Sequence, residues 1–111
     1  MVNIFEDLKE LNKPCFAQGD APEVLPDEYY TISEDYTDDN LNANNEALEH
    51  LYEFTLYFYT KDIKTLYTGL QEAITLLKSK GYIIGGVGYK NATYKNTWYS
   101  RMVDVERIDY L

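Results

Sequence analysis

The sequence predicts an α+β fold, namely a mainly antiparallel β-sheet of about four strands flanked by two α-helices, in the order α-β-β-β-α-β-β. Two long segments, residues 47–60 and 97–110, alternate apolar and polar residues as half-buried strands do. Between them, the apolar residues of segment 62–80 recur at helical spacing. Helices and strands that share one core in this order are typical of α+β proteins. A chain of 111 residues has the size of one domain, so we expect a single domain over residues 1–111.

The N-terminal segment predicts a helix followed by a short strand. Asn3 is suited to cap the helix, and Glu6 stands three residues later, as in a capping box. Pro14 ends the helix, and residues 15–18 are expected to form the short strand. The apolar stripe of this helix consists of Ile4, Phe5, Leu8 and Leu11.

Two turn-rich segments enclose the next strand. Residues 19–27 contain one glycine and two prolines and are predicted to form a loop. Residues 28–34 alternate in polarity, with Tyr30 and Ile32 on one face. The following segment, residues 35–45, reads DYTDDNLNANN. We expect an exposed, mobile loop there, because the segment is polar, turn-prone and too long for a tight hairpin.

Segment 47–60 is the clearest strand, and its two faces differ in chemistry. One face is mostly apolar and suits a core, with Leu48, His50, Tyr52, Phe54, Leu56 and Phe58. The other face mixes acids with tyrosines and consists of Glu49, Leu51, Glu53, Thr55, Tyr57 and Tyr59. A sheet built on this strand is expected to leave one side available for contact.

The second half of the chain predicts one helix and two strands. Asp62 is suited to cap the helix, and Gly81 is suited to close it. Residues 82–89 follow as a strand with internal glycines, and a polar turn is expected at residues 90–92. The last strand loses its alternation near Met102 and Val103, which indicates a bulge. The helix stripe consists of Ile63, Leu66, Tyr67, Leu70, Ala73, Ile74 and Leu77.

The charged residues are distributed unevenly along the chain. The net charge is −9, yet residues 1–60 hold 14 acids and 2 bases, whereas residues 61–111 hold 5 acids and 8 bases. Solubility alone explains an acidic surface. The split also suits a subunit that packs head-to-tail with its own copies, an acidic surface against a basic one. Direct binding to nucleic acid is not expected, because the overall sign opposes the phosphate backbone.

Cysteine content and hydropathy narrow the class of protein. Cys15 is the only cysteine, so neither an internal disulfide nor a cysteine-based zinc site is expected. Residues 1–7 do not resemble a signal peptide, because acids reach the place where its apolar core should be. No apolar run approaches the roughly 20 residues that span a bilayer. We therefore expect a protein made in a cytoplasm, with no membrane partner.

Two segments imitate ligand-binding motifs. The stretch KGYIIGGVGYK, residues 80–90, is glycine-rich, but its glycines follow a helix rather than lead into one. A phosphate site needs a helix N-terminus, so a strand with bends is the better interpretation. Acidic and amide side chains at Asp38, Asn40, Asn42, Asn44 and Glu49 have the spacing of a calcium loop. Ala43 stands where that loop needs glycine, and strands flank the segment, so chance spacing is the favoured explanation.

Residues suited to catalysis are sparse. His50 is the only histidine and falls on the apolar face of its strand, while Cys15 has no base nearby in the sequence. We expect no catalytic residues, no cofactor and no metal site, and thus no enzyme. Three aromatic patches, at residues 29–30, 57–59 and 98–99, are expected to supply core residues and an oligomer contact.

The layout as a whole resembles the tail-completion or tail-terminator proteins of long-tailed bacteriophages, which act at the junction of head and tail. The likeness covers nearly the full chain. It consists of the N-terminal helix and Pro-bounded loop, the strand YYTISE at residues 29–34, the polar loop, the strand end LYFYTK at residues 56–61, the helix with its GY exit at residues 81–82, and the last strand SRMVDVE at residues 100–106.

This resemblance implies a structural protein of the virion tail or neck, made in the host bacterial cytoplasm. It would assemble as a homo-oligomer, typically a hexameric ring, on the tail tube end, where it would stop polymerisation and meet the head connector. No catalytic residues come with the family. The residues expected at the assembly interface are Tyr36, Asp38, Asp39, Glu53, Tyr57, Tyr59 and Arg101. The alternative hypothesis is a small acidic inhibitor or DNA mimic that binds a host nucleic-acid-binding protein.

Overall fold

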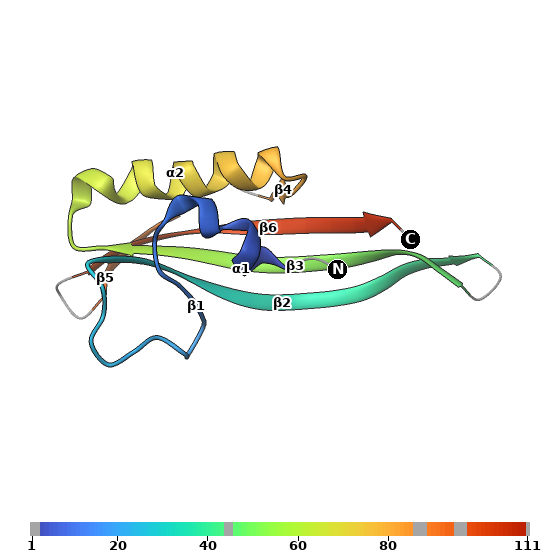
Figure 1. Cartoon of the computed structure of the whole chain (residues 1–111), viewed down its shortest axis with the longest axis horizontal. Coiled ribbons are helices and arrows are strands. Elements are labelled where there is room, and N and C mark those ends of the chain that lie inside the picture. Colours follow the sequence, from blue (N-terminus) through green and yellow to red (C-terminus); the bar gives the residue numbers. More distant parts are fainter. Residues whose placement is uncertain (1–2, 44–45, 86–88, 95–97, 111) are drawn as a thin grey trace.

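The computed structural model describes residues 3–43, 46–85, 89–94 and 98–110 (Figure 1). Within these ranges it describes the backbone alone for residues 36–43, 46–49, 89–94 and 110. Its elements are α1 (Ile4–Asp7), the 3-10 helix η1 (Lys9–Leu11), β1 (Cys15–Ala17), β2 (Glu28–Ala43), β3 (Glu46–Thr60), α2 (Ile63–Ser79), β4 (Ile83–Ile84), β5 (Tyr89–Tyr94) and β6 (Trp98–Tyr110).

The strands form a single sheet in the described part of the chain. Its order is β1-β2-β3-β6-β4, and β5 pairs with β6 as well. Only β1 runs parallel to its neighbour; the other pairs are antiparallel. Helix α2 lies along one face, which we call the helix face, and the connection from β1 to β2 lies beneath the opposite, outer face (Figure 1). The predicted mainly antiparallel α+β fold is confirmed, but the predicted number of strands is too low.

The prediction of a loop at residues 35–45 is wrong for residues 35–43, which the structure describes as part of strand β2. Strand β2 continues to Ala43, and its ladder with β3 runs to the pair Ala43–Glu46. A bulge lies between Glu34 and Tyr36. The long partner strand supplies hydrogen bonds to this polar backbone, which overrides the weak strand propensity of Asp and Asn. Residues 44–45, where the connection falls, lie outside the described residues.

Two expectations about the last strands are also corrected. Residues 90–92 belong to β5 rather than to a turn, with Lys90 opposite Arg101. Strand β6 has no bulge near Met102, because its register with β3 is continuous from Tyr110 to Tyr99. The alternation slips there because both faces of β6 are partly covered, so apolar Met102 is half-buried on the outer face. The predicted strand at residues 82–89 is described only as β4 and the first residue of β5.

The caps of α2 are as predicted. The Asp62 carboxylate accepts the Lys64 backbone N–H at 2.9 Å. At the other end, Gly81 has a left-handed φ of 93°, and the Tyr82 N–H donates to the Leu77 carbonyl. This is a Schellman ending, which requires a residue that tolerates positive φ. The predicted stripe is narrower than expected, since Ile63 and Tyr67 are exposed.

The first helix is shorter than predicted. Asn3 caps it, accepting the Glu6 N–H at 3.2 Å, but α1 makes one turn and passes into η1. Asn12 leaves the helix with a φ of 55°, two residues before Pro14. Phe5 is exposed rather than part of the buried stripe. The Tyr82 hydroxyl donates to the Asp7 carboxylate at 2.6 Å, which attaches α1 to the exit of α2.

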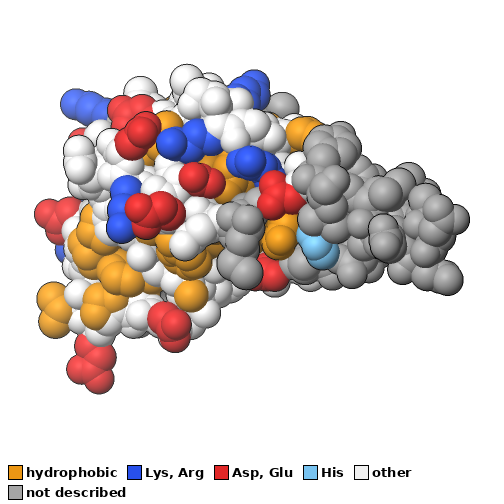
Figure 2. Space-filling view, turned by 45° about the vertical axis from the view of Figure 1, so that its right-hand side comes forward, with side chains coloured by type: hydrophobic (Ala, Val, Ile, Leu, Met, Phe, Trp, Pro, Cys, Tyr) orange, Lys and Arg blue, Asp and Glu red, His pale blue; other side chains and the backbone are white. Residues whose placement is uncertain are grey.

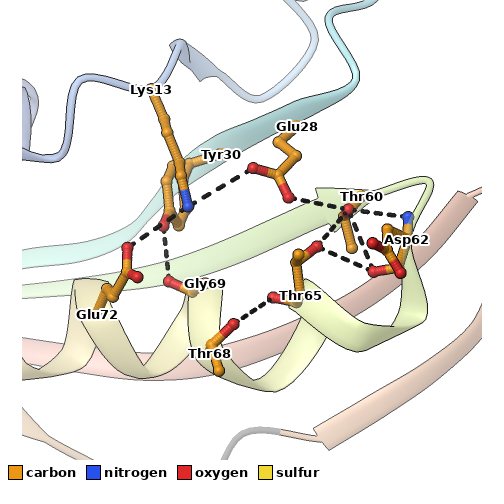
Figure 3. Close-up of polar contacts among 9 residues, drawn as sticks. All are labelled: Lys13, Glu28, Tyr30, Thr60, Asp62, Thr65, Thr68, Gly69 and Glu72. Atoms are coloured by element: carbon orange, nitrogen blue, oxygen red, sulfur yellow. Dashed lines mark hydrogen bonds and ion pairs between the residues drawn. The ribbon is translucent and has the colours of Figure 1, made fainter.

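Helix α2 approaches the sheet most closely at Gly69. A Cβ at Gly69 would lie 2.3 Å from the fully buried Phe58 ring, so only glycine fits. The Tyr30 hydroxyl donates to the Gly69 carbonyl at 2.7 Å (Figure 3). Beside them, the Lys13 ammonium lies 3.5 Å from the Glu72 carboxylate and 3.7 Å from that of Glu28 (Figure 3). These contacts join α2, β2 and the segment before β1.

Candidate assembly surface

The outer face of the sheet carries an aromatic cluster near the start of β2. The rings of Tyr29 and Tyr59 stack with centroids 4.8 Å apart. Tyr29 also meets Trp98 edge-on at 5.4 Å and Phe16 at 6.0 Å. Tyr57 extends the cluster along β3, 6.1 Å from Tyr59. Rings on this face are therefore packed on one another without α2, which covers the opposite face.

Farther along the same face the surface becomes acidic. Glu53 and Glu106 are direct cross-strand neighbours on β3 and β6. The Thr55 hydroxyl donates to the Asp35 carboxylate and lies 3.4 Å from the Asp104 carboxylate. In the described residues, no group of three possible ligands is arranged to hold a metal ion. The outer face thus changes from aromatic to acidic along the strands.

The seven predicted interface residues do not lie on one surface. Tyr57, Tyr59 and Glu53 share the outer face of β3. Arg101 lies on the helix face, where its guanidinium is 4.4 Å from the centroid of the Tyr67 ring of α2. A continuous interface over the outer face would therefore not include the Arg101 guanidinium.

The remaining three predicted residues lie on β2 beyond the bulge. Tyr36 is opposite Glu53, Asp38 is opposite Leu51, and Asp39 is opposite His50. Their side chains fall outside the described part of the structure. Their backbone belongs to the hairpin of β2 and β3, which continues past the ends of α2 and β6 (Figure 1).

Among the described strands, neither edge of the sheet is fully covered by a further strand, and the two edge strands differ in sequence charge. Strand β1 pairs with β2 only from Tyr30 to Ile32, and no other described strand lies beside that edge of β2. At the opposite edge, β5 pairs with β6 alone among the described strands. Between Pro14 and Thr60 every formally charged side chain is acidic, whereas residues 73–103 contain five bases and no acid. The sequence of β2 thus contains acids and no base, whereas the one charged residue in the sequence of β5 is Lys90.

A pocket lies between the outer face and the β1–β2 connection. It measures about 450 Å³ and is lined by residues that include Gln18, Glu23, Tyr29, Thr31 and Tyr59. In Figure 2, hydrophobic side chains gather on the lower left of the molecule, with acidic side chains at their margin. The sequence analysis missed this pocket, because it treated residues 19–27 as a connecting loop and nothing in their pattern indicates what they cover.

The residues considered for catalysis are not assembled into a site. The Cys15 thiol is half-buried and lies 3.7 Å from the Lys13 carbonyl oxygen. Burial raises the pKa of Cys15 to about 11, so the thiolate is scarce near neutral pH. His50 is half-buried on β3, with its ring 6.3 Å from that of Tyr52.

The two motif imitations have structural explanations. Gly81 follows the C-terminus of α2, where the helix dipole disfavours phosphate. Residues 38, 40 and 42 are in an extended strand paired with β3, rather than in a loop flanked by helices. Gly86 and Gly88 lie outside the described residues.

In comparisons with known proteins, the chain matches no protein family model and no curated protein. Among the described residues, no helix is long and apolar enough to cross a membrane. Proposals about function therefore depend on the arrangement of the residues themselves.

Proposed function

We propose that this chain is a phage virion-assembly protein of the head–tail junction. It assembles as a ring on the end of the tail tube, terminates the tail and joins it to the head. Its partners are further copies of itself, the tail tube protein and the head connector proteins. One observation carries the proposal, namely that the described strands form a single sheet whose edge strands differ in sequence charge, with acids in β2 and a lysine in β5.

Open edges of this kind favour association between copies. An edge strand presents unpaired N–H and C=O groups, which a strand of another chain can satisfy. If the β2 edge of one copy meets the β5 edge of the next, the contact is heterologous, and such contacts generate rings when the rotation closes. Lys90 of β5 and the acids along β2 favour this contact over contact between two like edges.

The length of the hairpin supports a second contact. The molecule measures 53 × 26 × 24 Å, and β2 and β3 lie along its length. Glu46 and Ala47 of β3 pair with β2 beyond the last described residue of β6. A two-stranded arm is marginally stable alone, so it gains from packing on a neighbouring protein. We infer that it contacts the tail tube or the connector.

The alternative is an acidic inhibitor that mimics DNA. The acids Asp35, Glu53, Asp104 and Glu106 on the outer face favour it, because a DNA mimic needs carboxylates over one continuous surface. The aromatic cluster interrupts that surface, and the basic segment at β5 opposes binding to a site built for nucleic acid. The assembly protein is therefore the better proposal.

Charge exchange at the two edges tests the proposal. We expect purified protein to form a discrete oligomer in native mass spectrometry and to bind one end of purified tail tubes in electron micrographs. The double variant Asp38→Lys/Asp39→Lys should lose the oligomer, and adding Lys90→Glu at the opposite edge should restore it. The control Glu6→Lys/Glu10→Lys changes the charge equally on α1 and η1, away from both edges, and should assemble normally.

Two results would contradict the proposal. Assembly that is indifferent to Asp38→Lys/Asp39→Lys would remove the role of the β2 edge. A strict monomer that binds neither tube nor connector, yet displaces DNA from a nuclease or repressor, would support the inhibitor instead.

A further inference from the structure

Thr31 lines the pocket, and its buried hydroxyl has no hydrogen-bond partner among the described residues. The Thr31 side chain is 7% exposed, and its hydroxyl makes no hydrogen bond within the described residues. Thr55 lies on the same face of the sheet with the same exposure, and its hydroxyl donates to a carboxylate. Buried polar groups are nearly always satisfied, so an unpartnered one that lines a pocket indicates a missing partner.

The residues that line the pocket indicate the charge of the group that would bind there. Glu23 contributes a carboxylate and Gln18 a carboxamide, while Tyr29 and Tyr59 contribute aromatic rings. No base lines the pocket, and the chain has none between Pro14 and Thr60. A phosphate or carboxylate ligand would meet no positively charged side chain there and would be repelled by the Glu23 carboxylate. A cation can pair with the carboxylate and lie against a ring, whose face attracts positive charge.

The aromatic cluster already binds a cation within the molecule. The Lys61 ammonium lies 5.0 Å from the centroid of the Trp98 ring, and that centroid is 5.4 Å from the centroid of the Tyr29 ring. The same ammonium is 3.6 Å from the Asp27 carboxylate. A ring and a carboxylate thus hold a lysine beside the pocket, and the pocket repeats this combination with Tyr59 and Glu23.

The wall of the pocket is loosely attached. Residues 21–26 make no backbone hydrogen bond to the rest of the described chain, whose nearest such bonds are at Asp20 and Asp27. Segments with few hydrogen bonds open at low free-energy cost. The wall can therefore adjust to bring a bound group to the Thr31 hydroxyl.

We propose that this pocket binds a basic side chain, arginine or lysine, of a partner protein. The charged group lies against the Tyr59 ring and pairs with the Glu23 carboxylate, and the Thr31 hydroxyl accepts one of its hydrogen bonds. This inference goes beyond the assembly proposal and does not depend on it, because a monomer has the complete pocket.

The test uses the full chain and a small probe. N-acetyl-arginine amide is titrated against N-acetyl-citrulline amide, which has nearly the same shape without the charge. Trp98 is the only tryptophan and touches Tyr29, so its fluorescence reports on the pocket, and amide NMR shifts locate the contact. We expect saturable binding of the arginine probe, with shifts at residues 18–31, and binding of the citrulline probe about tenfold weaker.

Variants distinguish binding of the probe in the pocket from binding to acids elsewhere on the outer face. Glu23→Gln changes an exposed side chain, so we expect the fold to stay intact. Both Glu23→Gln and Thr31→Val should weaken binding of the arginine probe several-fold. The control Glu53→Gln removes an outer-face acid far from the pocket and should leave binding unchanged. Equal binding of both probes, or no saturable binding of the arginine probe, would overturn the proposal. A loss of arginine-probe binding in Glu53→Gln but not in Glu23→Gln would also overturn the proposal.

Discussion

Thr31 and Thr55 form a matched pair that tests how the outer face is stabilised. Both are threonines on the outer face of neighbouring strands, two positions apart in register, and both are 7% exposed. They differ in whether the hydroxyl has a partner among the described residues. Changing each to valine removes the hydroxyl and keeps the β-branched shape that strands favour. The two substitutions should therefore change stability in opposite directions.

The magnitudes follow from the contacts of each hydroxyl. A buried polar group without a partner costs about 1–3 kcal/mol, so Thr31→Val should stabilise the fold by about 1 kcal/mol or more. The Thr55 hydroxyl donates to the Asp35 carboxylate and lies near that of Asp104. A hydrogen bond to a charged group contributes about 1.5–3 kcal/mol, and the exposure of both acids reduces this. Thr55→Val should cost about 1–2 kcal/mol.

Urea unfolding at pH 7, followed by circular dichroism and Trp98 fluorescence, measures both changes. The midpoint should rise for Thr31→Val and fall for Thr55→Val, with unchanged slopes. Several protein concentrations are needed, because assembly would make apparent stability depend on concentration. If Thr31→Val destabilises the protein as much as Thr55→Val does, the Thr31 hydroxyl has a partner, and the reasoning behind the pocket fails.

Three further predictions concern the helix face. Gly69→Ala would push a methyl group to 2.3 Å from the Phe58 ring, and we expect a loss of about 2 kcal/mol even after the gain in helix propensity. Urea midpoints check this, with Gly85→Ala, whose Cβ would have ordinary 3.4 Å contacts, as the nearly neutral control. Asp62→Ala removes the cap of α2 and should cost about 1 kcal/mol, seen as a lower thermal midpoint; an unchanged midpoint would exclude a role for the cap. Burial raises the pKa of Cys15 to about 11, so the folded state holds this proton more tightly than the unfolded state. Stability from this group is complete below pH 9 and is lost as pH rises toward 11, and Cys15→Ala should flatten that part of the pH–stability curve.

Local sequence patterns predicted the secondary structure well where each face of a segment lies in one environment, either the core or the solvent. Strand β3 and helix α2 were predicted close to their observed bounds, because their apolar residues recur at the period of the element. Asp62 and Gly81 were identified as the caps of α2 because capping depends on a few neighbouring residues. The predicted outer face of β3, with Glu53, Tyr57 and Tyr59, is the face away from α2.

The features that were predicted wrongly depend on contacts between residues that are distant in the sequence. Residues 35–43 are strand because β3 is long enough to pair with them, although their composition favours a loop. Arg101 lies beneath α2 because β6 pairs in continuous register with β3, which no local pattern specifies.

The sequence by itself determined the α+β class, the central strand and helix, and the division of charge along the chain. Only the tertiary structure decided that β2 and β5 lie toward opposite edges of one sheet, because strand order is set by pairing between distant segments. Only the tertiary structure likewise folded residues 19–27 over the outer face and left the Thr31 hydroxyl without a partner beneath them. Composition and periodicity record what each residue prefers, whereas an edge or a pocket depends on which residues are brought together.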